Sequence, residues 1–240
     1  MCGRFLRTSS LEEVVSAFTA EGTVSLPVSF NVAPTTSIYV IRHDETRRVV
    51  EPMLWGLIPF WSKDTSRAAN AINARAESLT EKPSFRHLVS RHRCILPLDG
   101  YYEWDTVSWR GKGHSKQPYL VSAIRGGGVD HAGLLGAAGL WSTWRDPDND
   151  DSVVHSVAMV TTEATGRLAE IHHRMPLLVD VEELEEWLDP ASDLPGWTSA
   201  PRGAMDVEVR AVSTRVNSVR NNDPTLIEPL ASPEGEPTLF

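Results

Sequence analysis

The chain has 240 residues, of which 41% are hydrophobic and 23% are charged, and its formal net charge is −9 at pH 7. These values are ordinary for a globular protein with a sizeable core, and no apolar run approaches the roughly 20 residues that a membrane helix needs. The acidic balance argues against a general nucleic-acid-binding protein, and two cysteines do not indicate a disulfide framework. We therefore expect a cytoplasmic protein with reduced thiols, no membrane contact and no secretory signal.

The first notable residue along the chain is Cys2. If Met1 is removed, Cys2 carries an α-amine and a thiol on adjacent carbons, and such an aminothiol condenses with an aldehyde to give a thiazolidine ring. The reference pKa values, about 7.7–8.0 for the amine and about 8.5 for the thiol, leave both groups usable near neutral pH. Any small residue can follow Met1, so the position alone decides nothing.

Hydrophobic periodicity and turn residues predict short helices and strands. A capping-box pattern at Ser10 and Glu13 opens a helix over residues 11–20, and further helices are predicted over 74–82, 84–91, 162–171 and 181–188. Strands are predicted over residues 37–42, 47–54, 94–98, 101–104, 119–124, 134–141, 153–161, 177–179 and 207–212.

The mixture of strands and helices has no regular βαβ repeat, which favours an α+β fold. We expect a single domain over residues 1–230, built around a mainly antiparallel, partly barrel-like β-sheet with short flanking helices. Residues 231–240 contain two prolines and a glycine, and we expect them to form a loose tail.

Two segments in the first third combine polar or aromatic groups with prolines. Asn31 precedes the turn residue Pro34, where it can hold the backbone or contact a substrate. Trp55 and Trp61 flank a glycine and a proline, and they suit either a buried wall or a stacking surface for single-stranded nucleic acid. Both interpretations stay open on the sequence alone.

Asn73 and Arg75 alternate with alanines, so their side chains point to the same side if the segment is extended. An amide beside a guanidinium suits a sugar hydroxyl and a phosphate. The alternative is a structural ion pair between Arg75 and Glu77. The wider stretch over residues 62–96 is rich in lysine and arginine, which gives the acidic protein a local basic face.

Glu103 lies between Tyr102 and Trp104, where desolvation would raise its pKa and allow it to act as both acid and base. His172 and His173 are adjacent, but no Cys-x-x-Cys or His-Glu-x-x-His pattern accompanies them. One of the two histidines is therefore expected to carry protons rather than bind metal, and the other to be structural.

Taken together and in this order, the motifs resemble the SRAP family, named for SOS-response-associated peptidases and also described as abasic-site processing proteins. The resemblance spans nearly the whole chain, up to about residue 217. It rests on Met1-Cys2-Gly3-Arg4-Phe5, Asn31-Val32-Ala33-Pro34, Trp55-Gly56-Leu57-Ile58-Pro59, Ile72-Asn73-Ala74-Arg75-Ala76-Glu77, Gly100-Tyr101-Tyr102-Glu103-Trp104, Lys116-Gln117-Pro118-Tyr119 and His172-His173-Arg174-Met175-Pro176.

The resemblance implies covalent crosslinking to abasic sites in single-stranded DNA. Cys2 would be the nucleophile after loss of Met1, and its amine and thiol would close a thiazolidine on the sugar aldehyde, which shields the lesion from strand cleavage. Glu103 would transfer protons, His172 would promote opening of the sugar, and Asn73 would orient it.

The resemblance also implies a DNA-binding set. Arg4 and Arg75 would bind the flanking phosphates, with Asn31 nearby, and Trp61 would stack beside the lesion. No cofactor and no metal are expected, and a monomer is the default. The acidic net charge does not argue against this function, because a protein that bonds covalently to DNA needs only weak electrostatic attraction to it.

Two other functions stay open. Cys2, Glu103 and His172 could form a cysteine peptidase or autopeptidase, whose minimal reaction would be removal of Met1. A plain binder of single-stranded DNA would use Trp55, Trp61 and the basic stretch, and its binding would be lost with salt. We rank the crosslinker first, the peptidase second and the plain binder third.

Overall fold

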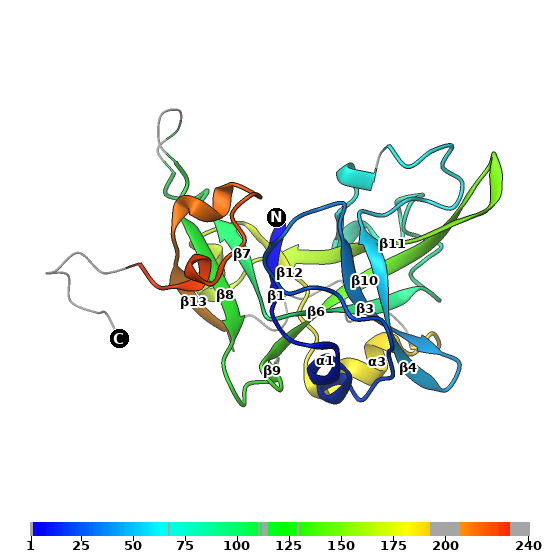
Figure 1. Cartoon of the computed structure of the whole chain (residues 1–240), viewed down its shortest axis with the longest axis horizontal. Helices are drawn as coiled ribbons and strands as arrows, with labels where there is room; N and C mark the ends of the chain where they lie inside the picture. Colours follow the sequence, from blue (N-terminus) through cyan, green and yellow to red (C-terminus); the bar gives the residue numbers. More distant parts are fainter. Residues whose placement is uncertain are drawn as a thin grey trace, which may run out of the picture.

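The computed structural model describes residues 2–66, 68–109, 111, 115–128, 130–192 and 207–230. Within them, five strands close into a barrel in the order β11 (Asn149–Glu163), β4 (Arg47–Trp55), β3 (Ser37–Asp44), β6 (Arg93–Leu98) and β10 (Leu134–Asp146), with β10 pairing back to β11. The contact between β11 and β4 is parallel and the other contacts in the ring are antiparallel. Figure 1 shows this barrel on the right of the molecule.

A second, antiparallel sheet packs beside the barrel. Its order is β13 (Val207–Ala211), β8 (Pro118–Ala123), β7 (Gly100–Trp104), β1 (Arg4–Arg7) and β2 (Ser29–Val32). Figure 1 shows β1 and β7 near the centre of the molecule, between the barrel and the strands β8 and β13. The start of the chain therefore lies where the two sheets meet.

Three short strands extend the barrel sheet. β5 (Asn73–Arg75) runs parallel to β11, β12 (Arg174–Pro176) runs antiparallel to it, and β9 (Asp130–His131) pairs with β10. β5 and β12 contact the same part of β11, because Thr161 pairs with residues of both. This shared strand brings the Asn73 segment and the segment after His172 into one region.

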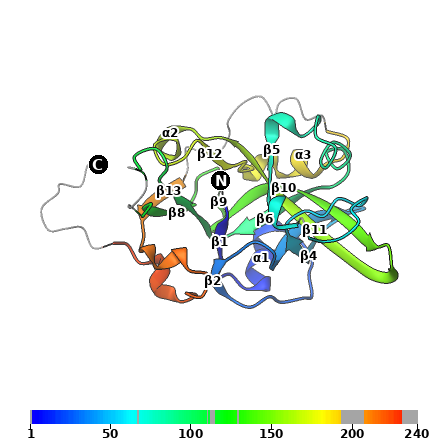
Figure 2. The ribbon, with the colours of Figure 1, turned by 90° about the horizontal axis from the view of Figure 1, so that it is seen from above.

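The helices are short. They are α1 (Leu11–Phe18), α2 (Gly166–Ala169) and α3 (Leu184–Leu188), and the 3-10 turns are η1 (Ala68–Asn70), η2 (Ala76–Ser78), η3 (Val181–Glu183), η4 (Thr214–Asn217) and η5 (Pro224–Ile227). The Ser10 hydroxyl accepts from the Glu13 amide at 3.2 Å and the Glu13 carboxylate accepts from the Ser10 amide at 2.7 Å, so the predicted capping box opens α1. Figure 2 shows α1 and α3 at the barrel, with the β10–β11 hairpin extending outward. No helix of the described residues is long and apolar enough to cross a membrane.

The predicted fold class, with its mainly antiparallel and partly barrel-like sheet, is confirmed. The strands expected over 37–42, 47–54, 94–98, 101–104, 119–124, 134–141, 153–161 and 207–212 all form, most of them longer than predicted. β1 and β2 were not predicted. The expected tail at 231–240 lies outside the described residues.

The errors concern helices and one strand. The helix over 74–82 is wrong, because Asn73–Arg75 pairs with β11 and only Ala76–Ser78 coils. The helix over 84–91 is a series of turns, in which backbone bonds to the third and fourth preceding residues alternate. The helix over 162–171 shortens to Gly166–Ala169, because β11 continues to Glu163. In the strand expected over 177–179, only Leu178 makes a bridge, to Ala137.

Candidate active site around Cys2

Cys2 lies at the junction of the two sheets, two residues before the start of β1. β1 pairs with β7 so that Phe5 faces Tyr101 and Arg4 faces Tyr102. The Cys2 side chain is fully buried, in the apolar cluster that also contains Phe5 and Tyr101, and its thiol donates to the Arg4 carbonyl at 3.7 Å. The pairing of β1 with β7 therefore fixes the position of Cys2 in the structure.

Asn73 holds the backbone of Cys2 from the barrel side. Its side-chain nitrogen Nδ2 donates to the Cys2 carbonyl at 2.9 Å. Because that carbonyl can only accept, the orientation of the amide is fixed, and its oxygen Oδ1 is buried without a hydrogen-bond partner among the described residues. The preceding carbonyl of Ile72 accepts from the Trp55 indole at 3.1 Å, which anchors β5 in this place.

Glu103 comes from β7, and its side chain is only 4% exposed. Burial raises the pKa of Glu103, while the Trp104 amide donates to its Oε1 at 3.2 Å. Burial also raises the pKa of the Cys2 thiol well above its usual range, and the charge of Glu103 raises it further. Burial therefore disfavours the simultaneous ionisation of both groups, and a carboxyl group with a raised pKa is suited to take and return a proton during a reaction.

His172 lies two residues before the start of β12 and is buried, whereas His173 is exposed. The Arg174 amide donates to His172 Nδ1 at 2.9 Å, and the Arg174 carbonyl lies 3.2 Å from the same nitrogen, so the backbone of Arg174 orients the ring. The two imidazoles stack with ring centroids 4.3 Å apart. Burial lowers the pKa of His172 to about 4, and the nearby charge of His173 contributes to this shift.

We expect His172 to titrate near pH 4 in the folded protein, against an ordinary value of 6.5. Because its folded pKa is depressed, the unfolded chain binds more protons between pH 6.5 and 4. The stability that this group contributes is therefore complete above pH 6.5 and is lost as the pH falls toward 4. An NMR titration of the imidazole, assigned with His172→Asn, measures this midpoint. A midpoint at or above 6.5 would show that the ring is solvated or paired with an acid.

An ion pair joins the segments of Asn73 and His172. The guanidinium of Arg174 donates to both carboxylate oxygens of Glu77, at 2.6 and 3.0 Å, and also to the Thr161 carbonyl at 2.5 Å. This fork connects η2, β11 and β12. The suggested pair of Arg75 with Glu77 is not formed as a salt bridge; Arg174 takes that place, and Arg75 is exposed.

Arg4 and Asn31 lie together on the other face of β1. Arg4 Nη1 donates to the Asn31 side-chain oxygen at 2.9 Å and to the Val216 carbonyl at 3.1 Å. The Asn31 amide in turn donates to the carbonyls of Ser218 and Asn221, at 3.0 and 2.9 Å. Asn31 thus fixes the position of Arg4 and ties both to the segment around η4.

The two tryptophans of the Trp-Gly motif have different environments. Trp55 is fully buried and packs against Phe5, with ring centroids 5.0 Å apart, so it is part of the buried core and not of the surface. Trp61 is 57% exposed and lines a surface pocket of about 630 Å³ with Lys63 and Asn70. Of these two tryptophans, Trp61 is the one that can offer a stacking surface.

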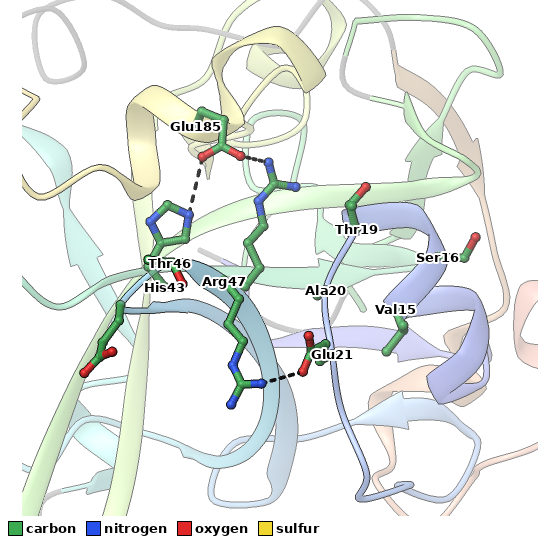
Figure 3. A pocket seen from close by; sticks show the side chains of 11 residues that line it. Val15, Ser16, Thr19, Ala20, Glu21, His43, Thr46, Arg47 and Glu185 are labelled. Atoms are coloured by element: carbon green, nitrogen blue, oxygen red, sulfur yellow. Dashed lines mark hydrogen bonds and ion pairs between the residues drawn. The ribbon is translucent and has the colours of Figure 1, made fainter.

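A second surface pocket, of about 650 Å³, lies between α1 and the β3–β4 hairpin. Figure 3 shows its ion pairs, from Arg47 to Glu21 and from His43 to Glu185. None of the predicted site residues lines it. The described residues also contain no group of three or more His, Cys, Asp or Glu side chains placed to hold a metal ion.

No prediction selected Tyr101, which shares the apolar cluster of Cys2, or Arg174, which links the segments of Asn73 and His172. Tyr101 alternates with Glu103 on β7, and Arg174 is two residues beyond His172. The alternation of Tyr101 with Glu103 was a usable signal for the first. No sequence signal indicated the pairing of Arg174 with Glu77, because nearly a hundred residues separate them.

Comparison with known proteins gives a consistent result. A sequence model of the family described as SOS response associated peptidase (SRAP) matches residues 1–219. Abasic site processing protein YoqW of Bacillus subtilis (strain 168) is 34% identical over 234 residues, covering 95% of this chain and 99% of that protein. Abasic site processing protein HMCES of Pongo abelii is 30% identical over 216 residues, covering 78% of this chain and 58% of that protein.

Solved structures share the fold. A crystal structure of a protein from Bacteroides thetaiotaomicron superposes with a TM-score of 0.82 at 25% identity, covering 96% of this chain and 100% of that one. A protein from Bordetella bronchiseptica superposes with a TM-score of 0.70 at 23% identity, covering 88% of this chain and 100% of that one.

Proposed function

Because the chain belongs to the SOS response associated peptidase family, and its relatives YoqW and HMCES are named abasic site processing proteins, we propose that it bonds covalently to abasic sites in single-stranded DNA. In this proposal Met1 is first removed, and the amine and thiol of Cys2 then react with the ring-opened aldehyde of the lesion. The product is a thiazolidine that protects the strand from cleavage.

The observation that carries the proposal is the environment of Cys2. The cysteine is fully buried beside Glu103, and Asn73 holds its carbonyl at 2.9 Å. A solvated terminal cysteine would react with many aldehydes and oxidants. Burial restricts access to a substrate that the surrounding surface delivers, and the buried carboxylate supplies the proton transfers that ring formation needs.

The chemistry proceeds in balanced steps. As the closed sugar opens to the aldehyde, the proton of the C1′ hydroxyl passes through solvent to O4′, and the neutral His172 ring donates a hydrogen bond that stabilises the charge developing on O4′. The Cys2 amine adds to C1′, and the resulting carbinolamine loses one water to give an imine. The sulfur then bonds to C1′ while Glu103 takes the thiol proton and returns it to the nitrogen. The net change is the loss of one water, and closure removes the imine that would promote β-elimination.

Two arginines on the surface around Cys2 are proposed to bind the DNA backbone. Arg4 is fixed by Asn31, so its guanidinium is oriented in advance toward a phosphate. Arg75 is exposed at the end of β5, on the same side of the strand as Asn73. The net charge of −9 keeps binding to undamaged DNA weak, so retention at the lesion depends on the covalent bond.

Trp61 is proposed as the stacking surface beside the lesion. We expect Trp61→Ala, measured in a Cys2→Ala background that cannot crosslink, to weaken single-stranded DNA binding by about 1–3 kcal/mol, roughly 5- to 150-fold. The ring is largely exposed, so the melting temperature should stay unchanged. Fluorescence anisotropy gives the Kd, and Val153→Ala, on the hairpin strand β11, serves as a control. Equal affinity of the Trp61 variant and its parent would remove stacking from the proposal.

The proposal is tested by mixing the protein with single-stranded DNA that contains one abasic site and running a denaturing gel. Undamaged DNA and Cys2→Ala are run alongside. A detergent- and heat-stable adduct that needs both Cys2 and the lesion supports the crosslinker. Absence of an adduct, with Met1 shown by mass spectrometry to be removed, would favour the cysteine peptidase formed by Cys2, Glu103 and His172 instead.

We further propose that residues 1–230 act as one domain, that the protein works as a monomer in the cytoplasm, and that it needs no cofactor. Sedimentation of the protein alone and on an abasic oligonucleotide tests the oligomeric state. A mass for two chains on one lesion would contradict it.

A further inference from the structure

The hydroxyl of Tyr101 has no hydrogen-bond partner among the described residues, although the side chain is only 1% exposed. Its neighbour Tyr102 makes the contrast clear, because the Tyr102 hydroxyl donates to the Phe30 carbonyl at 2.8 Å. A buried phenol normally finds a partner, since leaving its hydroxyl dry and unpaired costs about 1–3 kcal/mol. Phenylalanine would supply the same packing without that cost.

The position of Tyr101 relates its hydroxyl to the reacting groups. Tyr101 and Glu103 are two residues apart on β7, so they share one face of the strand. β7 pairs with β1 in the same sheet, where Phe5 is the direct partner of Tyr101, and Tyr101 shares its apolar cluster with Cys2. The charges of Cys2 and Glu103 also act on the Tyr101 phenol, which together with burial raises its pKa well above the usual value.

The high pKa settles which form of the phenol is present. At neutral pH Tyr101 keeps its proton and is a hydrogen-bond donor, not a base. Cys2 and Glu103 act on the phenol only through their charges, and neither hydrogen-bonds to its hydroxyl. A donor in this place has a natural acceptor only when a substrate oxygen enters.

We propose that the Tyr101 hydroxyl donates a hydrogen bond to the aldehyde oxygen of the abasic sugar, in the step in which the Cys2 amine adds to C1′. This inference rests on the proposed function. As nitrogen bonds to carbon, the carbonyl π pair moves onto oxygen, and the phenol stabilises that developing charge. The oxygen takes one proton from the attacking amine to give the carbinolamine. Glu103 supplies the second proton, with which the oxygen leaves as water, and recovers a proton from the nitrogen as the imine forms. The pre-placed donor acts in a dry site, where such contacts are strongest.

The test compares Tyr101→Phe with Tyr102→Phe, two variants that each remove one oxygen atom from neighbouring positions of the same strand. Wild type and both variants are reacted with abasic single-stranded DNA over a range of concentrations. For Tyr101→Phe we expect the rate at saturating DNA to fall about 100-fold, in the range known for loss of one such donor, with no change in the DNA concentration at half-maximal rate.

The melting temperature separates a chemical role from a structural one. Tyr101→Phe should melt at or above the wild-type temperature, because it removes an unpaired buried polar group. Tyr102→Phe should melt lower, because it loses a made hydrogen bond, and should crosslink at the wild-type rate. An unchanged saturating rate for Tyr101→Phe overturns the inference, and so does a lowered melting temperature, since the hydroxyl would then have a structural partner.

A second substrate isolates the chemistry from DNA binding. 2-Deoxyribose 5-phosphate presents the same aldehyde, and intact mass spectrometry follows its addition to the matured protein with loss of one water. Tyr101→Phe should slow this addition by a similar factor, and equal rates would overturn the inference. If wild type forms no adduct with abasic DNA, the proposed function itself fails; if wild type reacts and Tyr101→Phe reacts equally fast, only the role of Tyr101 fails.

Discussion

Cys2→Ser abolishes the heat-stable adduct with abasic DNA, while Cys94→Ala keeps it. This result is expected because serine retains the terminal amine but has no thiol, so the reaction stops at an imine that water reverses. Both cysteines are fully buried, so burial does not distinguish them. Only Cys2 can carry an amine next to its thiol, and the loss should reach the background level of an undamaged strand.

The measurement for this prediction is a time course on a denaturing gel, with and without borohydride. Borohydride reduces an imine to a stable amine, so it should trap Cys2→Ser on the lesion and leave the wild-type adduct unaffected. Cys2→Ser should also leave the abasic strand more open to cleavage, because the imine is not closed. A stable adduct of Cys2→Ser without borohydride would contradict the role of the thiol.

Glu103→Gln should slow adduct formation by about 10²–10⁴-fold, the usual effect of losing a general acid–base group. The amide has the same shape but cannot take the thiol proton. Reversal of the adduct should slow by the same factor, because a group that carries protons in one direction carries them in the other. The final extent of crosslinking is then unchanged, which separates this effect from weak binding.

Stability provides the control for Glu103. Burial raises the pKa of its carboxyl group, so the charged form is disfavoured in the folded protein. The neutral amide should therefore leave the melting temperature unchanged or raise it. Glu51→Gln, on the outer part of β4 where Glu51 pairs with Arg42, is a matched variant that should crosslink at the wild-type rate. If Glu103→Gln formed and reversed the adduct at the wild-type rates, proton transfer would belong to another group.

Local sequence signals correctly predicted the elements whose contacts join residues that are close in the chain. The α1 helix follows from its capping box, and the β3–β4 hairpin from two strand-forming segments joined by a polar turn. The segment over residues 74–82 was wrongly predicted as helix, because its propensity is helical. Parallel pairing with β11, more than eighty residues away in the chain, supplies backbone partners that outweigh this propensity.

The sequence suggested candidate site residues but not the contacts between them. Cys2 was selected for the aminothiol that loss of Met1 would create, together with the family resemblance, and Glu103 for its aromatic neighbours. The structure brings Asn73 to the Cys2 carbonyl. The pairs that assemble the site join distant segments. Arg174 takes Glu77 from Arg75, and no local pattern indicates which guanidinium a carboxylate will meet.

The same limit explains Asn31 and Tyr101. Asn31 was expected beside the DNA, and the structure shows its amide engaged by Arg4 and by carbonyls after η4, segments that only the folded chain brings together. Tyr101 reads as one more aromatic residue of a buried strand. Its unpaired hydroxyl becomes visible only when every neighbouring group is in place.

The central claim is that an aminothiol at Cys2 closes on the sugar aldehyde, and mass spectrometry of the DNA-linked peptide tests it most directly. The protein is reacted with a short single-stranded oligonucleotide that carries one abasic site, and the adduct is then digested with trypsin to isolate the peptide that begins at Cys2. We predict a mass equal to the Met1-free peptide plus the oligonucleotide minus one water, with no free thiol for iodoacetamide to alkylate. A DNA-linked peptide that still contains Met1, or whose Cys2 thiol remains alkylatable, would contradict the account.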